Sequence, residues 1–342
     1  MSATLSVVIP VYNEEAGLAA LFERLYPELD KLGRQYEVIF VDDGSSDRSV
    51  ALLREQFQGR PDVTRVVVLA RNAGQHMAIL AGFAQTRGDY VVTLDADLQN
   101  PPEEIAKIIA QMDEGADYVG TVRARRHDVY WRKAASRMMN RIRERTTQIS
   151  ITDQGCMLRG YHRTIVEAIN RCLEVSTYVP ALGYTFARHP VEIEVAHAER
   201  KAGQSKYSLY RLIRLNFDLM TGFSVAPLQF FTMAGTALAI LSLLFVLFLA
   251  LRRLVVGPEA EGVFTLFGIA FFLIGVLLVG LGVVGEYVGR IYEQVRQRPR
   301  YMVAAILEEG NDATQRLPLQ QPDSSQPPDS LQRTPHPAGD VE

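Results

Sequence analysis

The stretch GDYVVTLDADLQNPPEE, residues 88–104, ends an apolar run with two aspartates placed two positions apart. Side chains of an extended strand alternate between its two faces, so Asp95 and Asp97 point to the same side. Neighbouring carboxylates repel each other unless a positive charge lies beside them. The stretch therefore predicts a buried strand that ends at a site for a cation.

Similar apolar runs recur through residues 1–205 and alternate with amphipathic stretches. The runs are LSVVIPVY, YEVIFVDD, TRVVVLA and ADYVGTV, and helices are predicted at about residues 14–33, 47–57, 76–85 and 103–114. Continuous apolar strands separated by helices are typical of a mainly parallel sheet covered on both faces. The sequence thus predicts an α/β domain whose ligands bind beyond the carboxyl ends of its strands.

A polar cluster follows each of the first four predicted strands. These clusters are YNEE at 12–15, DDGSSD at 42–47, RNAGQ at 71–75 and DADLQ at 95–99. Alone, DDGSSD is more typical of a turn and helix cap, and a lone DxD is commonly a solvated turn. Together they predict one site, and its two carboxylates and amide oxygen suit Mg²⁺ or Mn²⁺ better than zinc.

Composition excludes several classes of protein. The net charge of −3 over 342 residues argues against a nucleic-acid binder. Cys156 and Cys172 have no zinc-site spacing and suggest no disulfide framework, which fits a reducing cytoplasm. The N-terminus lacks the basic region of a signal peptide and is expected to form a strand.

Two uncharged apolar stretches, residues 228–251 and 263–284, each exceed the roughly 20 residues that cross a bilayer as a helix. Buried helices of a soluble protein are the alternative, but these normally keep a polar stripe. Lys and Arg are more frequent outside the two stretches than in the short loop between them, so the domain of residues 1–205 and both termini are expected in the cytoplasm.

The remaining segments differ in character. Residues 206–227 have the pattern of an amphipathic helix, either in the membrane interface or packed on the domain. Residues 286–309 are expected to be a cytoplasmic C-terminal segment, and residues 310–342, rich in Pro, Gln and Ser, a disordered tail.

The motifs VVIPVYNEE, VDDGSSD, LARNAGQHMAILAGF and LDADLQNPPEE resemble those of the inverting glycosyltransferases of family 2, which have a GT-A fold. The membrane-anchored branch that glycosylates polyprenyl phosphates is the most similar, through RKAASRMMNR, DQGCMLRGY, AERKAGQSKYS and GEYVGRIYEQVRQRPRY. The resemblance spans roughly residues 4–303. It implies a UDP-sugar donor, an undecaprenyl phosphate acceptor, a bacterial inner-membrane location and a homo-oligomer, a tetramer in relatives.

The resemblance also implies roles for particular residues. Those expected to bind the nucleotide sugar are Pro10, Tyr12, Glu14, Asp42, Arg71 and Asp95, while Asp97 and Gln99 would hold Mg²⁺ or Mn²⁺. Those expected to bind the lipid phosphate are Arg123, Arg132, Ser136, Arg200 and Lys206. Asp97, Arg132 and Asp153 are the expected catalytic residues. Asp153 matches the place of a base, and orienting the substrates or capping a turn are its alternatives.

The sugar stays open at this point. The resemblance favours 4-deoxy-4-formamido-L-arabinose, with glucose or another hexose as the alternative. A phosphate monoester is already anionic at neutral pH, so its oxygen can attack without a strong base while positive charge stabilises the leaving UDP. A membrane protein that only senses a nucleotide sugar is a further alternative, but it would not need a metal placed for a leaving group.

Overall fold

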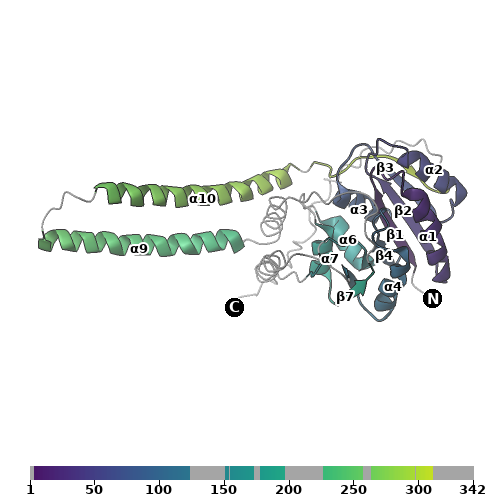
Figure 1. The fold of residues 1–342 in the computed structure, drawn as a ribbon, viewed down its shortest axis with the longest axis horizontal. Helices are drawn as coiled ribbons and strands as arrows, with labels where there is room; N and C mark the ends of the chain where they lie inside the picture. The colour runs from purple at the N-terminus through teal and green to yellow at the C-terminus, as the bar shows by residue number, and fades with distance from the viewer. Residues whose placement is uncertain are drawn as a thin grey trace, which may run out of the picture.

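The computed structural model describes residues 4–123, 151–153, 155–172, 178–196, 226–256, 263–296 and 298–310. In these ranges the chain forms an α/β domain and two long helices that extend away from it (Figure 1). Several predictions fall outside the described residues. These are the roles of Arg132, Ser136, Arg200 and Lys206, nearly all of the amphipathic helix at 206–227, and nearly all of the tail.

One sheet of eight strands organises the described domain, in the order β7-β5-β6-β4-β1-β2-β3-β8. Its strands are β1 (Leu5–Val11), β2 (Tyr36–Asp42), β3 (Thr64–Leu69), β4 (Tyr90–Thr93), β5 (Tyr118–Arg123), β6 (Arg159–His162), β7 (Pro190–Val195) and β8 (Val303–Leu307). β1 pairs in parallel with β2 and β4, and β2 with β3. β6 and β8 pair antiparallel with their neighbours. The predicted mainly parallel α/β domain is confirmed.

Helices cover both faces of this sheet. α1 (Leu18–Lys31), α2 (Ser49–Gly59), the short 3₁₀ helix η1 (Pro102–Glu104) and α4 (Ile105–Asp113) lie on one face, where Leu21, Leu53 and Ile108 are buried in one apolar cluster. α3 (Gln75–Phe83), α6 (Arg163–Arg171) and α7 (Val179–Phe186) lie on the other. Because both faces are covered, the strands carry continuous apolar runs rather than alternating ones.

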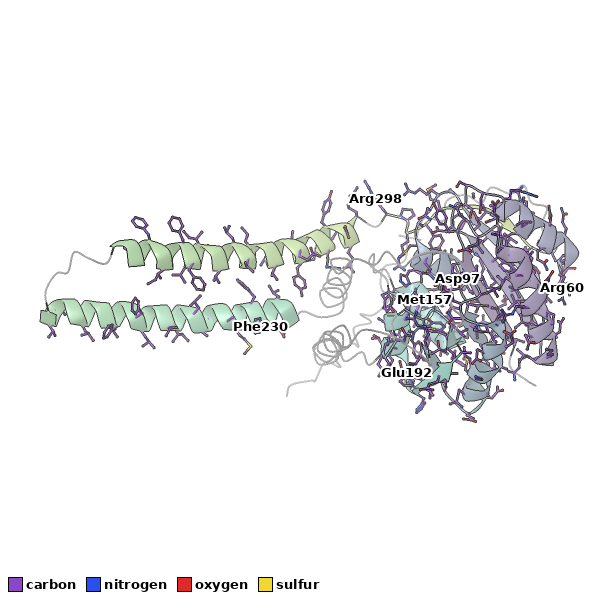
Figure 2. All side chains as sticks on the ribbon, viewed as in Figure 1. Arg60, Asp97, Met157, Glu192, Phe230 and Arg298 are labelled. Atoms are coloured by element: carbon purple, nitrogen blue, oxygen red, sulfur yellow. The ribbon has the colours of Figure 1, made fainter. Side chains whose placement is uncertain are left out.

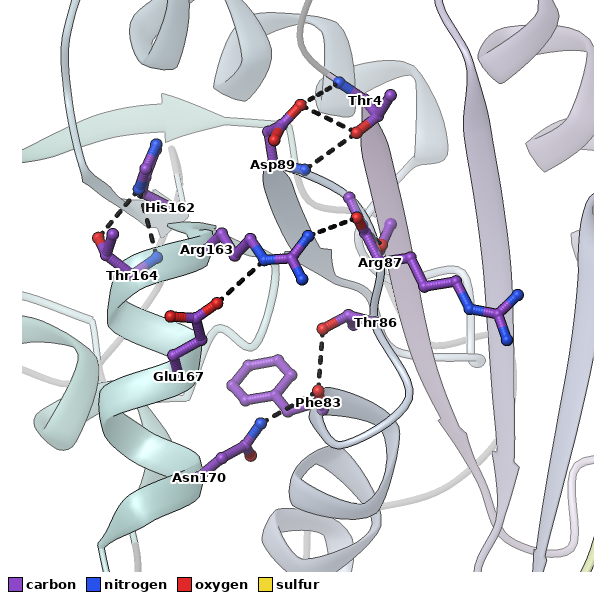
Figure 3. Close-up of polar contacts among 12 residues, drawn as sticks. Thr4, Phe83, Thr86, Arg87, Asp89, His162, Arg163, Thr164, Glu167 and Asn170 are labelled. Carbon is purple, nitrogen blue, oxygen red and sulfur yellow. Dashed lines mark hydrogen bonds and ion pairs between the residues drawn. The ribbon is translucent and has the colours of Figure 1, made fainter.

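Polar contacts fix α6 at the edge of the sheet opposite the polar clusters (Figure 3). Nη1 of Arg163 donates to the carbonyl oxygen of Arg87 over 2.8 Å, and Nδ2 of Asn170 donates to that of Phe83 over 3.2 Å. The carboxylate of Asp89 accepts hydrogen bonds from the main chain and hydroxyl of Thr4, both at 2.9 Å. These bonds hold the end of α3 and the segment before β4 to α6, and they hold the same segment to the start of β1.

The two predicted membrane stretches lie in α9 (Ala226–Val256) and α10 (Val263–Val295). The two helices contact each other where the ring of Phe231 fills the space beside Gly280. Figure 2 shows Phe230 near the start of α9 and Asp97 in the α/β domain. Among the described residues one helical segment, Ile269–Val295, is long and apolar enough to cross a membrane, and the shorter Leu228–Leu238 in α9 is apolar too.

β8 was not predicted from the sequence. After α10 the chain returns to the domain and pairs with β3, the outermost of the parallel strands. The main-chain N–H of Ala70 donates to the carbonyl oxygen of Met302 over 2.8 Å. Residues that follow the long apolar helix therefore complete the sheet beside the loop that contains Arg71.

Candidate functional site

The carboxyl ends of β1 to β5 all lie at one edge of the sheet. β1 to β4 are parallel, and β5 runs in the same direction because β6 is antiparallel to both β4 and β5. This edge receives Tyr12 after β1, Asp42 at the end of β2, Arg71 after β3, Asp95 after β4 and Arg123 at the end of β5. The topology thus brings together the clusters that the sequence placed after separate strands.

Hydrogen bonds join the loop after β1 to the loop after β2. Oδ1 of Asn13 accepts from the main-chain N–H of Ser46 over 2.8 Å, and the N–H of Asn13 donates to Oγ of Ser45 over 3.0 Å. The N–H of Glu14 donates to Oγ of Ser49 over 3.0 Å. Asn13 adopts φ of 53°, in the left-handed region that Asn tolerates. The DDGSSD motif therefore serves as a turn, and it also positions the YNEE loop.

Asp42 is buried, and its two carboxylate oxygens differ. Oδ2 accepts hydrogen bonds from the N–H groups of Gly44 and Ser45, each at 3.1 Å. Oδ1 is buried without a hydrogen-bond partner among the described residues. A buried acceptor without a partner is costly, so Oδ1 is suited to receive an N–H or O–H group from a ligand.

Asp43 connects the loops after β2 and β3. Its Oδ1 accepts from the N–H of Ala73 over 2.7 Å and its Oδ2 from the N–H of Gly74 over 2.9 Å. Gly44 allows this approach, because a Cβ there would lie 2.6 Å from the main-chain nitrogen of Asn72. Burial raises the pKa of Asp43, and the two N–H groups oppose that effect. The Asp43 contacts fix the loop that carries Arg71.

Asp95 lies at the centre of the charged groups. Burial, and then the charge of Asp97, raise its pKa to about 7, while Gln75 and Arg123 act in the opposite direction and Glu14 raises it further. Nε2 of Gln75 donates to Oδ1 of Asp95 over 2.6 Å. These contacts place groups from three of the four clusters, YNEE, RNAGQ and DADLQ, and from the end of β5 around one carboxylate.

Asp97 occupies a tight turn beside Asp95. Its Oδ1 accepts from the N–H of Gln99 over 3.1 Å, and Leu98 between them has φ of 58°. Asp97 and Gln99 are half-buried, so their side-chain oxygens can be reached from the site edge.

A divalent cation fits the donors at this edge. The described residues hold no group of three His, Cys, Asp or Glu side chains arranged for a metal. Mg²⁺ needs no such group, because one or two carboxylates together with substrate phosphates suffice. A cation between Asp95 and Asp97 would also relieve the repulsion that raises the pKa of Asp95.

Arg123 and Asp153 form an ion pair on the β5 side of the site. Nε and Nη2 of Arg123 donate to the two carboxylate oxygens of Asp153 over 2.6 and 2.8 Å. Asp153 also accepts from the N–H of Gly155 over 3.0 Å, as a turn cap does. Its role in the structure therefore combines turn capping with orientation of Arg123.

The other predicted residues have simpler surroundings. Pro10 is half-buried at the end of β1, and Arg71 is exposed. Tyr12 is also exposed, with 48% of its surface accessible, so its ring is free to stack on a planar ligand. Sequence reasoning did not single out Asp43 or Arg159. For Asp43 a signal was present in the doubled aspartate of DDGSSD, whereas Arg159 carried no signal because two of its three hydrogen-bond partners are main-chain atoms.

Comparisons with known proteins identify the family of this chain. The model of "Glycosyl transferase family 2" matches residues 6–169. Among solved structures, glucosyl-3-phosphoglycerate synthase from Mycobacterium tuberculosis in complex with Mn²⁺, uridine diphosphate and phosphoglyceric acid is 18% identical, with a TM-score of 0.45 over 64% of this chain and 77% of that chain.

Curated relatives are much closer. Three of them carry the name undecaprenyl-phosphate 4-deoxy-4-formamido-L-arabinose transferase. The protein of Edwardsiella ictaluri is 49% identical over 89% of this chain and 94% of its own length. That of Klebsiella pneumoniae subsp. pneumoniae is 50% identical over 91% and 95%, and that of Serratia proteamaculans 50% identical over 91% and 96%. The chain belongs to glycosyltransferase family 2, within the family of the undecaprenyl-phosphate 4-deoxy-4-formamido-L-arabinose transferases.

Proposed function

We propose that this protein transfers 4-deoxy-4-formamido-L-arabinose from its UDP donor to undecaprenyl phosphate, with inversion at the anomeric carbon and release of UDP. The observation that carries the proposal is the identity of about 50% to named transferases over about 90% of the chain. The glycosylated lipid would serve the modification of lipid A and resistance to cationic peptides such as polymyxin.

The donor would bind across the carboxyl ends of β1, β2 and β4. Pro10, Tyr12 and Glu14 would contact the nucleoside, with the exposed ring of Tyr12 stacked on the base. The free Oδ1 of Asp42 would accept a hydrogen bond from the uridine. Arg71 would pair with the diphosphate, and Asp95 would lie beside the sugar and diphosphate.

Asp97 and Gln99 would hold Mg²⁺ or Mn²⁺ at the end of β4. When bound, the cation would supply positive charge for the diphosphate that leaves. The half-buried position of both side chains and the repulsion between Asp95 and Asp97 support this assignment. Mg²⁺ and Mn²⁺ both prefer such oxygen donors.

The acceptor phosphate would bind on the β5 side. Arg123 lies there, fixed by Asp153, and Arg132, Ser136, Arg200 and Lys206 are the further groups proposed to contact it. Because the phosphate oxygen is already anionic, Asp153 need not remove a proton. Its bidentate contact with Arg123 supports an orienting role, and catalysis would rest on positioning and electrostatics.

A membrane setting follows from the lipid acceptor. We propose that α9 and α10 span the bacterial inner membrane and that residues 206–227 lie in its interface, with the domain of residues 1–205 and both termini in the cytoplasm. The segment Ile269–Val295 supports the second span. A homo-oligomer of such helices is part of the same proposal.

The test is UDP release by the full-length protein in detergent, with undecaprenyl phosphate and Mg²⁺ or Mn²⁺. The donor is UDP-4-deoxy-4-formamido-L-arabinose in one arm and UDP-glucose in the other. Lipid-dependent release with the formamido sugar alone is the expected result. Release with UDP-glucose instead would move the protein to the glucosyl branch. Binding of either donor without release would favour a sensor.

A further inference from the structure

Arg159, at the start of β6, is a fully buried guanidinium whose hydrogen-bond partners among the described residues are all neutral. Nε donates to the carbonyl oxygen of Cys156 over 2.9 Å, Nη2 to that of Asp153 over 2.6 Å, and Nη1 to the hydroxyl of Tyr118 over 2.5 Å. Burying a charge is unfavourable unless strong contacts compensate. An apolar side chain would fill this space at lower cost, so a role beyond packing is indicated.

Two of the three acceptors belong to the loop that carries Asp153. Arg159 holds the main-chain oxygens of Asp153 and Cys156, and Arg123 holds the carboxylate of the same Asp153. One arginine therefore fixes the main chain of Asp153, and the other receives its side chain. The direction of the Arg123 guanidinium depends on where Arg159 keeps this loop.

The loop is also tied to the neighbouring elements. Sγ of Cys156 contacts Oδ1 of the buried Asn100 over 3.4 Å, and Oγ1 of Thr121 donates to the carbonyl oxygen of Leu158 over 2.6 Å. Asn100 follows directly after Gln99 in the DADLQN stretch. A shift of the loop would thus reach both the Asp97 turn and the end of β5.

Two glycines leave room for the pair of arginines. A Cβ at Gly120 would lie 3.2 Å from Nη1 of Arg159, and a Cβ at Gly155 would lie 2.6 Å from Nη2 of Arg123. An added Cβ at Gly155 would displace the Arg123 guanidinium, and one at Gly120 would require the Arg159 guanidinium or Glu192 to shift slightly. Both guanidinium groups therefore have little free space around them, in addition to their specific hydrogen bonds.

We propose that Arg159 is a positioning residue for the transfer reaction: its guanidinium fixes the main chain at Asp153 and Cys156, so that the Asp153–Arg123 pair is held in the direction of the acceptor phosphate. This inference rests on the proposed transfer. It adds a residue that touches neither substrate and acts through Asp153.

The experiment compares Arg159→Lys with Tyr118→Phe in the full-length protein. Lysine keeps the charge but cannot hold both loop carbonyls in the planar geometry of a guanidinium. Phenylalanine at position 118 removes the Tyr118 hydroxyl, which among the described residues is the one acceptor of Arg159 outside the loop. Nη1 of Arg159 and the carbonyl oxygen of Pro180 then lose their contact with that hydroxyl. For each variant we would measure kcat, the KM for undecaprenyl phosphate, the Kd of UDP with Mn²⁺, and Tm.

In Arg159→Lys we expect kcat to fall about 100-fold, as for a small misplacement of reacting groups, with less than a twofold change in UDP affinity. Tyr118→Phe should lower Tm to a comparable extent and keep kcat within about threefold of the unmodified protein, because both loop contacts persist. Equal kcat values for the two variants at comparable Tm would reduce Arg159 to a stabilising residue and overturn the inference.

If Arg159→Lys does not fold, Gly120→Ala replaces it, because the added methyl group crowds Nη1 of Arg159 at 3.2 Å without removing the guanidinium. A severalfold loss of kcat with unchanged UDP affinity is then expected, and full kcat in a folded Gly120→Ala protein would contradict the inference. If the unmodified protein uses another donor sugar, the same ratios are measured with that sugar. If it transfers no sugar at all, the inference fails together with the proposed function.

Discussion

The carboxylate of Asp43 accepts a hydrogen bond from the main-chain N–H of Gly74 over 2.9 Å, and so joins the ends of two parallel strands. Its other oxygen binds the N–H of Ala73 over 2.7 Å. The loop between them and β3 contains Arg71, which is proposed to bind the diphosphate. The position of the Arg71 guanidinium, on an exposed loop, therefore depends on the carboxylate of Asp43, which is buried.

Asp43→Ala should destabilise the protein and weaken UDP binding. Two part-buried N–H groups would lose their acceptor, at a cost of about 1–3 kcal/mol, and the Arg71 loop would no longer be fixed. Asp43→Asn keeps one acceptor oxygen and should lose less. Calorimetric UDP binding and thermal unfolding measure both effects.

The control is Asp62→Ala, because Asp62 is an exposed carboxylate before β3. An unchanged UDP affinity in Asp43→Ala would contradict the prediction.

Asp97→Asn should abolish lipid-dependent UDP release, with a loss of roughly 1000-fold, because stabilisation of the leaving group by the cation is worth several kcal/mol. The metal-free variant should be at least as stable as the unmodified protein, since the repulsion that raises the pKa of Asp95 is gone. Thermal unfolding with and without Mn²⁺ and UDP measures the stability of the metal-free protein and of the protein with the cation bound. Turnover close to normal would remove Asp97 from the proposed metal site.

Glu308→Ala should loosen β8 from the sheet. Oε2 of Glu308 lies 3.2 Å from Nε of Arg65 and 2.9 Å from Nη2 of Arg87. The Arg65 side chain is only 6% exposed, so it would keep a single ion pair, to Glu37 at 3.4 Å. We expect a loss of about 1–3 kcal/mol, seen as a lower Tm. The exposed neighbour Glu309→Ala is the matched control, and equal Tm values for the two variants would contradict this role.

The parallel core and the location of the site follow from local sequence. Each of the first four strands is a continuous apolar run that ends in a polar cluster, and parallel pairing places all such ends at one edge. The side chains of Asp42 and Asp95 therefore fall at that edge, as predicted, and the end of β5 brings Arg123 to the same edge.

The missed features depend on contacts between distant residues. β6 is only four residues long and pairs with β4 and β5 on either side, and a strand of this length has too little periodicity to be recognised. β8 was missed because nothing within residues 303–307 indicates a return to β3. Asp43 binds two main-chain N–H groups and Arg159 binds two main-chain carbonyl oxygens, and a sequence pattern does not display such contacts.

The stability of the protein should fall between pH 6.5 and about 4 because of His76. Burial, and then the charge of Arg159, lower the pKa of His76 to about 4, and its buried Nδ1 has no hydrogen-bond partner among the described residues. In the unfolded chain the pKa returns to about 6.5. Over this range the unfolded state binds a proton that the folded state does not, so the free energy of unfolding falls as the pH falls, by about 3 kcal/mol at most.

His76→Met removes the titration, and its Tm should differ less between pH 7.5 and 5 than that of the unmodified protein. His189→Met, at an exposed ring, should leave the difference unchanged, and an equal pH dependence in all three proteins would disprove the assignment.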